Sequence, residues 1–168
     1  MNTGIRSILL ITKGHEPVAV ALATEIRDWL QERKVEAVIL PNCDPGTHPE
    51  AAPGQDLAHA AQEMQPDLAL IIGGDGTFLS VARRLGQTAI PLAAVNAGRV
   101  GFLSQLSRDD WQLKCEALLR REYRIMERLS LDFTVLRSGQ EGVTAHQGRA
   151  INDLVVNRGA LARLITLE

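Results

Sequence analysis

The stretch of sequence that decides the fold reads LALIIGGDGT and spans residues 68–77. Its first half, residues 68–72, is entirely apolar, which is typical of a strand buried on both faces of a parallel sheet. Residues 78–85 then carry apolar side chains at helical spacing. The segment between them therefore predicts a sharp turn from a buried strand into a helix.

This turn consists of Gly73, Gly74, Asp75, Gly76 and Thr77. Three glycines in four positions let the backbone bend and approach a ligand without a Cβ in the way. The N–H groups of such a turn, together with the start of the next helix, form a place where phosphate can bind. Because Asp75 adds a negative charge, the turn indicates chemistry on a hydroxyl, or a metal ion, beside the phosphates.

An ordinary turn is the competing interpretation, since Asp and Gly are common turn residues. The stretch is not the dinucleotide-binding fingerprint, because Phe78 occupies the position of its third glycine. It is not a Walker loop either, because no Gly-Lys-Ser/Thr follows. The turn alone leaves a binding site and a plain loop both open, so the rest of the chain has to decide.

Length and composition limit the classes of protein. The 168 residues suit one domain, or one domain with part of another, and 45% of them are hydrophobic. A net charge of −2 gives no basic surface, so no nucleic acid partner is expected. The apolar run at residues 8–11 is too short for a signal peptide or membrane span, so no membrane partner is expected. Cys43 and Cys115 lack metal-site spacing, which predicts no protein metal site and favours a reduced, cytoplasmic protein.

Apolar runs alternate with helical patterns through the first part of the chain, which predicts an open, doubly wound parallel sheet with helices on both faces. Ligands of such sheets bind beyond the carboxyl ends of the strands, where the two glycine-containing turns at 73–77 and 96–103 lie. A Pro- and Gly-rich loop is expected at 41–54. Residues 107–110 resemble a capping box. The expected strands are 8–11, 35–40, 68–72 and 90–95, and the expected helices follow them near 17–30, 57–64, 78–85 and 111–119.

After Tyr123 the pattern changes to alternating apolar and polar residues, which indicates antiparallel strands. We expect a half-buried strand at 129–135, a turn at 138–142, and further strands at 150–156 and 161–167. The chain therefore divides into an α/β domain, residues 1–122, and the beginning of an all-β domain, residues 123–168. Half-buried strands need a partner layer, so we expect this second domain to be cut short.

Three stretches together resemble the NAD kinase family. Residues 73–77 look like its G-G-D-G turn, and residues 96–103, NAGRVGFL, are similar to its N-x-G-x-L-G-F-L segment. Residues 150–156, followed by Arg158 and Gly159, resemble its Asn-Asp/Glu strand. The first motif is shared with diacylglycerol and sphingosine kinases, whereas the other two are more specific. The resemblance runs from Ile8 to Glu168, with mild departures at Val100 and Asn157, and the family's later Gly-Asp-Gly and Thr-Pro-Thr-Gly-Ser-Thr-Ala-Tyr segments lie beyond it.

The resemblance implies transfer of the γ-phosphoryl of ATP, or of polyphosphate, to the 2′-hydroxyl of the adenosine ribose of NAD, with Mg²⁺ on the phosphates. Asp75 is then expected to be the catalytic base, because a carboxylate within reach of a hydroxyl can take its proton. Gly73, Gly74, Gly76 and Thr77 are expected to form the phosphate loop, with Asp75 and Gly76 also at the nucleotide.

Other expected nucleotide-binding residues lie near the C-terminus. The resemblance implies that Asn152 and Asp153 contact the ribose hydroxyls or base of NAD, although Asp153 can instead satisfy N–H groups at a strand end. Arg163 falls where the family often has a basic residue near the ligand, and a surface arginine is the alternative there. The resemblance further implies a homo-oligomer at full length and negligible activity for this chain alone. A lipid kinase of the G-G-D-G group and a non-catalytic nucleotide-binding fragment are the alternatives.

Overall fold

A computed structural model describes residues 4–43, 57–97, 103–136, 144–151 and 153–155. The chain divides into two compact units, Met1–Glu127 and Arg128–Glu168. Each unit has its own sheet. Among the residues described, no helix has the length and apolar character that crossing a membrane requires.

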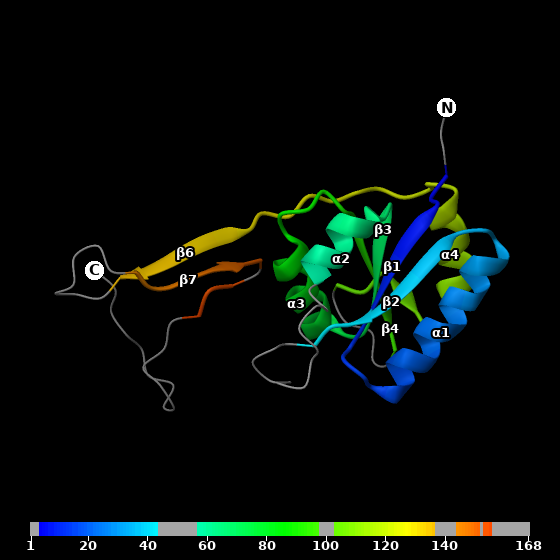
Figure 1. The fold of residues 1–168 in the computed structure, drawn as a ribbon, viewed down its shortest axis with the longest axis horizontal. Helices are drawn as coiled ribbons and strands as arrows, with labels where there is room; N and C mark the ends of the chain where they lie inside the picture. The colour runs from blue at the N-terminus through cyan, green and yellow to red at the C-terminus, as the bar shows by residue number, and fades with distance from the viewer. Residues whose placement is uncertain (1–3, 44–56, 98–102, 137–143, 152, 156–168) are drawn as a thin grey trace. The chain divides into compact units, whose positions relative to one another are not determined.

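The first unit is built on a five-stranded parallel sheet with the strand order β2-β1-β3-β4-β5 (Figure 1). Its strands are β1 (Ser7–Thr12), β2 (Glu36–Pro41), β3 (Leu68–Ile72), β4 (Leu92–Asn96) and β5 (Leu106–Ser107). Its helices are α1 (Pro17–Glu32), α2 (Leu57–Met64), α3 (Asp75–Leu85) and α4 (Trp111–Leu119). The predicted parallel α/β sheet is confirmed, and the two-residue strand β5 is an addition that the sequence pattern did not predict.

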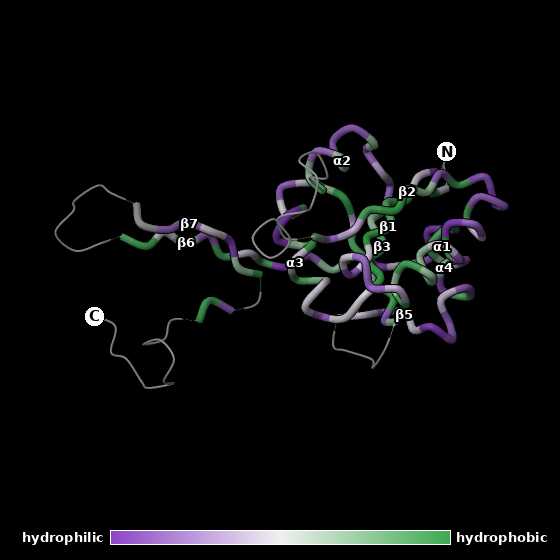
Figure 2. The backbone as a smooth tube through the Cα atoms, turned by 60° about the horizontal axis from the view of Figure 1, so that its bottom comes forward, coloured by the Kyte–Doolittle hydropathy of each residue, from purple (hydrophilic) through white to green (hydrophobic). Residues whose placement is uncertain are grey.

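Helices cover both faces of this sheet, α1 and α4 on one side and α2 and α3 on the other (Figure 1). Strand β3 lies in the middle, and all five of its residues are buried. Leu68, Leu70 and Ile72 pack toward α1 and α4, whereas Ala69 and Ile71 pack toward α2 and α3. Figure 2 shows the same strands as the hydrophobic interior of the unit. A strand that needs apolar side chains on both faces reads as a continuous apolar run, which is why it was recognisable.

The face under α1 and α4 contains a pair of tryptophans. The rings of Trp29 and Trp111 meet edge to face, with centroids 5.5 Å apart. The guanidinium of Arg33 lies 3.7 Å from the Trp29 ring centroid, and its Nε donates to Glu116 Oε1 at 3.0 Å. These contacts join α1 to α4 by packing and charge together.

Two helix starts differ from the sequence prediction. Helix α3 begins at Asp75, three residues before the apolar periodicity starts at Phe78, because the glycine turn itself is wound into the first helical turn. The Ser107 N–H donates to Asp110 Oδ1 at 2.7 Å, as a capping box requires, but α4 begins only at Trp111. Residues 108–110 therefore form a separate turn ahead of the helix.

The second unit contains the antiparallel pair β6 (Leu131–Leu136) and β7 (Thr144–Ala150). The strand predicted at 150–156 is wrong: the pairing ends at Ala150, and the described residues beyond it are not in a strand. Cross-strand fit favours the earlier segment, since Arg149 forms a bidentate ion pair with Asp132. A Cβ on Gly148 would lie 2.7 Å from the Phe133 ring, so this ring packs directly over a glycine.

Most side chains of β6 are exposed, and Phe133 is half-buried. The alternating pattern predicted a half-buried strand, but in the structure only Phe133 of β6 is half-buried. The predicted turn at 138–142 and the predicted strand at 161–167 lie outside the described residues, as does most of the predicted loop at 41–54.

Candidate active site

The topology identifies one edge of the sheet as the place for a ligand. From β1 the chain crosses to β2 on one side, and β3 and β4 follow on the other side of β1. The point where the strand order reverses lies between β1 and β3, and doubly wound sheets bind ligands outside the carboxyl ends of the strands at such a point. The glycine turn follows the carboxyl end of β3, so it lies at this edge.

Backbone hydrogen bonds define the turn. The Gly73 N–H donates to Val95 O at 3.0 Å, which continues the pairing of β3 with β4. Gly74 is extended, with φ −90° and ψ −175°, and precedes α3 as its N-cap residue. The Phe78 N–H donates to Gly74 O at 3.0 Å and closes the first helical turn. The first N–H groups of a helix point outward along its axis, and the helix dipole makes that end favourable for an anion.

The glycines of the turn differ in how much space surrounds their Cβ positions. A Cβ on Gly73 would lie 2.7 Å from Thr77 Oγ1 and 2.9 Å from Thr77 Cβ, so the chain itself excludes a side chain there. A Cβ on Gly74 or Gly76 would meet nothing within 4 Å, and neither residue has a left-handed backbone. Within the described residues no packing reason requires glycine at these two positions. Close approach of a ligand to the backbone would supply one.

A cavity of about 420 Å³ opens beside the turn. Three segments contribute to it: Lys13 follows β1, Asn42 follows β2, and the start of α3 supplies the rest. The Lys13 N–H donates to Ile72 O and the Asn42 N–H donates to Thr12 O, so both residues are held by extensions of the strand pairing. The residues that line the cavity are Lys13, Asn42, Gly74, Gly76, Thr77 and Ser80.

A hydrogen-bonded chain fixes the wall of the cavity that Asn42 and Ser80 form. Asn42 Nδ2 donates to Ser80 Oγ at 3.1 Å, and Arg84 Nη1 donates to Asn42 Oδ1 at 2.9 Å and to Cys43 O at 3.2 Å. With both ends of its amide engaged, Asn42 holds one orientation. Sequence reasoning missed Lys13, Asn42 and Ser80. The signal for Lys13 and Asn42 was their place directly after two parallel strands, and Ser80 is one helical turn beyond Gly76.

Asp75 is half-buried at the first position of α3, and its side chain is not part of the cavity wall. Its Oδ1 accepts a hydrogen bond from the Leu103 N–H at 3.1 Å. Leu103 ends the second glycine-containing segment that the sequence singled out, so the carboxylate joins the first motif to the second. Buried Asn96, which begins that segment, donates from Nδ2 to Ser104 Oγ at 3.4 Å. The carboxylate thus faces the β4 side of the turn, and the cavity lies on the β1 and β2 side.

The remaining predicted site residues belong to the second unit. Asn152 and Arg163 lie outside the described residues, and Asp153 is exposed in the second unit. Of the predicted phosphate loop, Gly74, Gly76 and Thr77 line the cavity, whereas Gly73 is buried against Thr77.

The described part of the chain has no group of three or more His, Cys, Asp or Glu side chains arranged to hold a metal ion. Cys43 and Cys115 are both buried free thiols. Burial, with a smaller contribution from the charge of Glu116, raises the pKa of Cys115 to about 12, so this thiol stays protonated at neutral pH.

The fold is that of a doubly wound α/β protein with its candidate site at the switch point of the sheet. A family model described as ATP-NAD kinase N-terminal domain matches residues 8–123. The NAD kinase of Nitratidesulfovibrio vulgaris strain DP4 is 47% identical over 164 residues, which are 98% of this chain and 50% of that protein. The NAD kinase of Geobacter sp. strain M21 is 36% identical over 168 residues, with 98% and 56% covered. The chain belongs to the NAD kinase family.

The chain spans about half the length of the curated relatives it matches. Among solved structures, the crystal structure of yeast NADH kinase complexed with NADH matches with a TM-score of 0.64. That match has 17% sequence identity and covers 89% of this chain and 47% of the yeast chain. At this identity the likeness supports the fold.

Proposed function

We propose that the whole protein transfers the γ-phosphoryl of ATP, or a phosphoryl of inorganic polyphosphate, to the 2′-hydroxyl of the adenosine ribose of NAD and so makes NADP. Membership of the NAD kinase family supports this activity. The observation that carries it is the open space at the Cβ positions of Gly74 and Gly76 beside the carboxylate of Asp75. A phosphate and an acceptor hydroxyl both need such an arrangement.

The cavity is the proposed place of the phosphate chain. Gly74 and Gly76 at a helix start line it together with Lys13 and Asn42, and the ammonium of Lys13 and the amide of Asn42 would bind the phosphates. Phosphoryl transfer depends mainly on positioning and on neutralising charge, and these groups serve both needs. Thr77 packs against Gly73 and keeps the turn in shape.

Asp75 is the proposed general base. The hydrogen bond from the Leu103 N–H fixes one of its oxygens and orients the carboxylate on the β4 side of the turn. A hydroxyl that approaches from the β4 side would meet this carboxylate before it meets the phosphates. Proton transfer from the 2′-hydroxyl to Asp75 would then make the oxygen a better nucleophile as its bond to phosphorus forms. The bond from that phosphorus to the bridging oxygen of the donor would break, and ADP or a shortened polyphosphate would leave.

A divalent metal ion, Mg²⁺ in this proposal, would accompany the phosphates. Mg²⁺ in kinase sites usually keeps several waters and is bound through substrate phosphates, so the donor phosphates would hold it here while Asp75 stays the base. When bound, the ion neutralises negative charge on the phosphate oxygens.

Several parts of the proposal concern residues or properties away from the turn. Asn152 and Asp153 are proposed to contact the ribose or base of NAD, and Arg163 is proposed to lie near the ligand. The whole protein is proposed to be a cytoplasmic homo-oligomer that takes ATP or polyphosphate as donor. Family membership supports these assignments.

The test is a steady-state assay of the purified whole protein with NAD, Mg²⁺ and either ATP or polyphosphate. NADP formation is followed with an NADP-specific dehydrogenase. The expected result is NADP that appears only when NAD and a donor are both present. Phosphorylation of diacylglycerol or sphingosine without NADP formation would replace the proposal with a lipid kinase. Donor binding without turnover on either acceptor would leave a nucleotide-binding protein.

A further inference from the structure

We propose that Lys13 binds the phosphate chain in the cavity and that Glu16 competes with the phosphate for the same ammonium. The balance between these two partners then sets the affinity for the donor. The inference rests on the proposed function, because it concerns the same cavity. It adds two residues that the sequence motifs do not contain.

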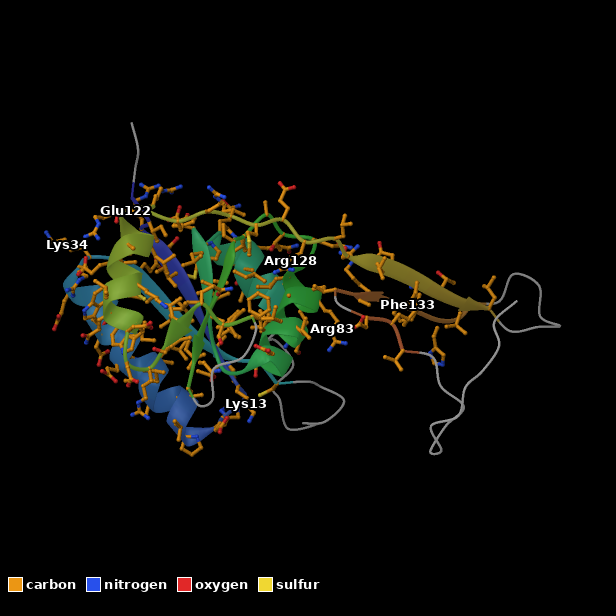
Figure 3. All side chains as sticks on the ribbon, turned by 180° about the vertical axis from the view of Figure 1, so that it is seen from behind. Lys13, Lys34, Arg83, Glu122, Arg128 and Phe133 are labelled. Atoms are coloured by element: carbon orange, nitrogen blue, oxygen red, sulfur yellow. The ribbon has the colours of Figure 1, made fainter. Side chains whose placement is uncertain are left out.

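Lys13 has the only charged side chain among the six described residues that line the cavity. It follows β1 directly, at the carboxyl edge of the sheet, where Figure 3 labels it. A multiply charged anion in this cavity would find its nearest lysine there. The other lining groups are neutral and offer hydrogen bonds alone.

The backbone on either side of Lys13 is fixed, so only its side chain has to move. The Lys13 N–H donates to Ile72 O, and the Glu16 N–H donates back to Lys13 O at 3.2 Å. Thr12 Oγ1 donates to Gly14 O at 2.8 Å. Gly14 has φ +52°, a left-handed conformation that glycine adopts without strain. This turn places Lys13 and Glu16 next to each other.

The ammonium of Lys13 is paired with Glu16, with Nζ 3.2 Å from Oε2. The two side chains are 62% and 46% exposed, so water screens the pair and its energy is small. Glu16 precedes α1 as its N-cap residue, but its side chain makes no capping hydrogen bond. Within the described residues this carboxylate therefore pairs with Lys13 and caps no helix, and a phosphate with several charges can displace it.

Ser80 is a second residue of the cavity wall that can bind the same ligand. Ser80 Oγ already accepts a hydrogen bond from Asn42 Nδ2, so its own O–H proton can be donated to a phosphate oxygen. Ser80 and Lys13 both line the cavity. A phosphate chain in the cavity would receive a hydrogen bond from Ser80 and a positive charge from Lys13.

The experiment is isothermal titration calorimetry of inorganic triphosphate into the 168-residue chain, with no NAD present. Lys13→Gln should weaken binding about tenfold and flatten its salt dependence, since it removes a charge-assisted contact. Glu16→Gln should strengthen binding roughly two- to threefold, because it removes a weak competitor. Lys34→Gln is the matched control, because Lys34 is an exposed lysine that precedes the amino end of β2, away from the cavity (Figure 3). The affinity of this variant for triphosphate should equal that of the parent.

Opposite effects at Lys13 and Glu16 would support the proposal. Equal affinities for the Lys13→Gln and Lys34→Gln variants would overturn it, and so would a Glu16→Gln variant that binds no more tightly than the parent. A parallel titration with ATP should show the same loss at Lys13, whereas a loss with ATP alone would place Lys13 at the nucleoside and overturn it too. Thermal unfolding of each variant verifies the fold.

This titration is independent of catalysis. Because it contains no acceptor and measures no transfer, triphosphate binding with the predicted pattern would stand even if NADP formation failed. NADP formation by the whole protein with unchanged Lys13→Gln binding would overturn the inference and leave the proposed function in place.

Discussion

Two aspartates flank strand β3, and they do different work. Asp67, at the amino end, accepts hydrogen bonds from the Arg6 N–H at 2.8 Å and the Ser7 N–H at 3.1 Å, and Arg121 lies 3.5 Å from its other oxygen. Asp75, at the carboxyl end, accepts from Leu103 beside an open cavity. The carboxylate of Asp67 joins neighbouring segments by hydrogen bonds and an ion pair, whereas that of Asp75 lies in a turn beside a cavity large enough for a ligand.

The same contrast separates the glycines of the turn. Gly73 is required by contact with Thr77 inside the chain, and Gly76 is required by nothing inside the described chain. Packing explains the first position, and we propose that ligand binding explains the second. Substitutions at the two aspartates, Asp67 and Asp75, and at the two glycines, Gly73 and Gly76, should therefore separate effects on stability from effects on function.

The largest expected effect is on catalysis at Asp75. In the whole protein, Asp75→Asn should lower the turnover number by roughly 10²–10⁴, the usual contribution of a general base, while NAD binding weakens less. Steady-state kinetics of NADP formation measure this. Asp67→Asn is the matched control and should keep the turnover of the parent. Near-normal turnover in Asp75→Asn would make Asp75 a turn residue.

The next effect is on stability at Gly73. Gly73→Ala should lower the free energy of unfolding by about 1–3 kcal/mol, since the new methyl overlaps the short, buried side chain of Thr77. Gly76→Ala should leave stability unchanged or raise it by about 0.5 kcal/mol, because alanine favours the helix, yet it should weaken triphosphate binding. Urea denaturation and calorimetry measure the two quantities. Equal stability losses at both glycines would contradict the distinction.

A smaller effect is expected at the amino end of the strand. Asp67→Asn should lower the free energy of unfolding by about 1–2 kcal/mol, because it weakens charge-assisted hydrogen bonds from two backbone N–H groups. Turnover per folded molecule should not change. Urea denaturation at pH 7 measures the loss, and a variant as stable as the parent would show that water replaces these bonds without cost.

The smallest effect is the pH dependence of that contribution. Burial alone would raise the pKa of Asp67, but the N–H groups of Arg6 and Ser7 and the charges of Arg121 and Arg6 hold it below its ordinary value of 3.8. A carboxyl with a lowered folded pKa stabilises the protein above the ordinary value, and the contribution is lost as pH falls through the lowered one. The stability difference between parent and Asp67→Asn should therefore shrink from pH 7 toward pH 2. A difference that grows on acidification would contradict this assignment.

The sequence predicted the sheet well because burial leaves a strong pattern. Residues 68–72 are apolar on both faces, and the structure buries each of them. Pro17 begins α1, as its fixed φ favours. The strand at 144–150 was not predicted, since most of its residues are polar, whereas the apolar residues after it predicted a strand at 150–156. Pairing of Asp132 with Arg149 and packing of Phe133 on Gly148 decided that register, and neither is visible in local hydropathy.

The candidate site was predictable in part for a similar reason. The glycine turn is contiguous, so its composition stands out along the chain. Lys13, Asn42 and Ser80 come from three separate segments, and the strand order brings them to one cavity. None of the three belongs to a recognisable motif in its own stretch of sequence. Only the topology, with β1 between β2 and β3, gives them a shared position.

The edge-to-face contact of Trp29 and Trp111 has a practical consequence for all these measurements. These are the two tryptophans of the sequence, and both lie on the sheet face under α1 and α4. Intrinsic fluorescence therefore reports whether that helical layer is docked, and its emission should shift to longer wavelength when the first unit unfolds. Phosphate entering a cavity lined by α3 should leave the emission spectrum unchanged. The protein thus carries its own optical reporter of folding that stays silent during a binding titration.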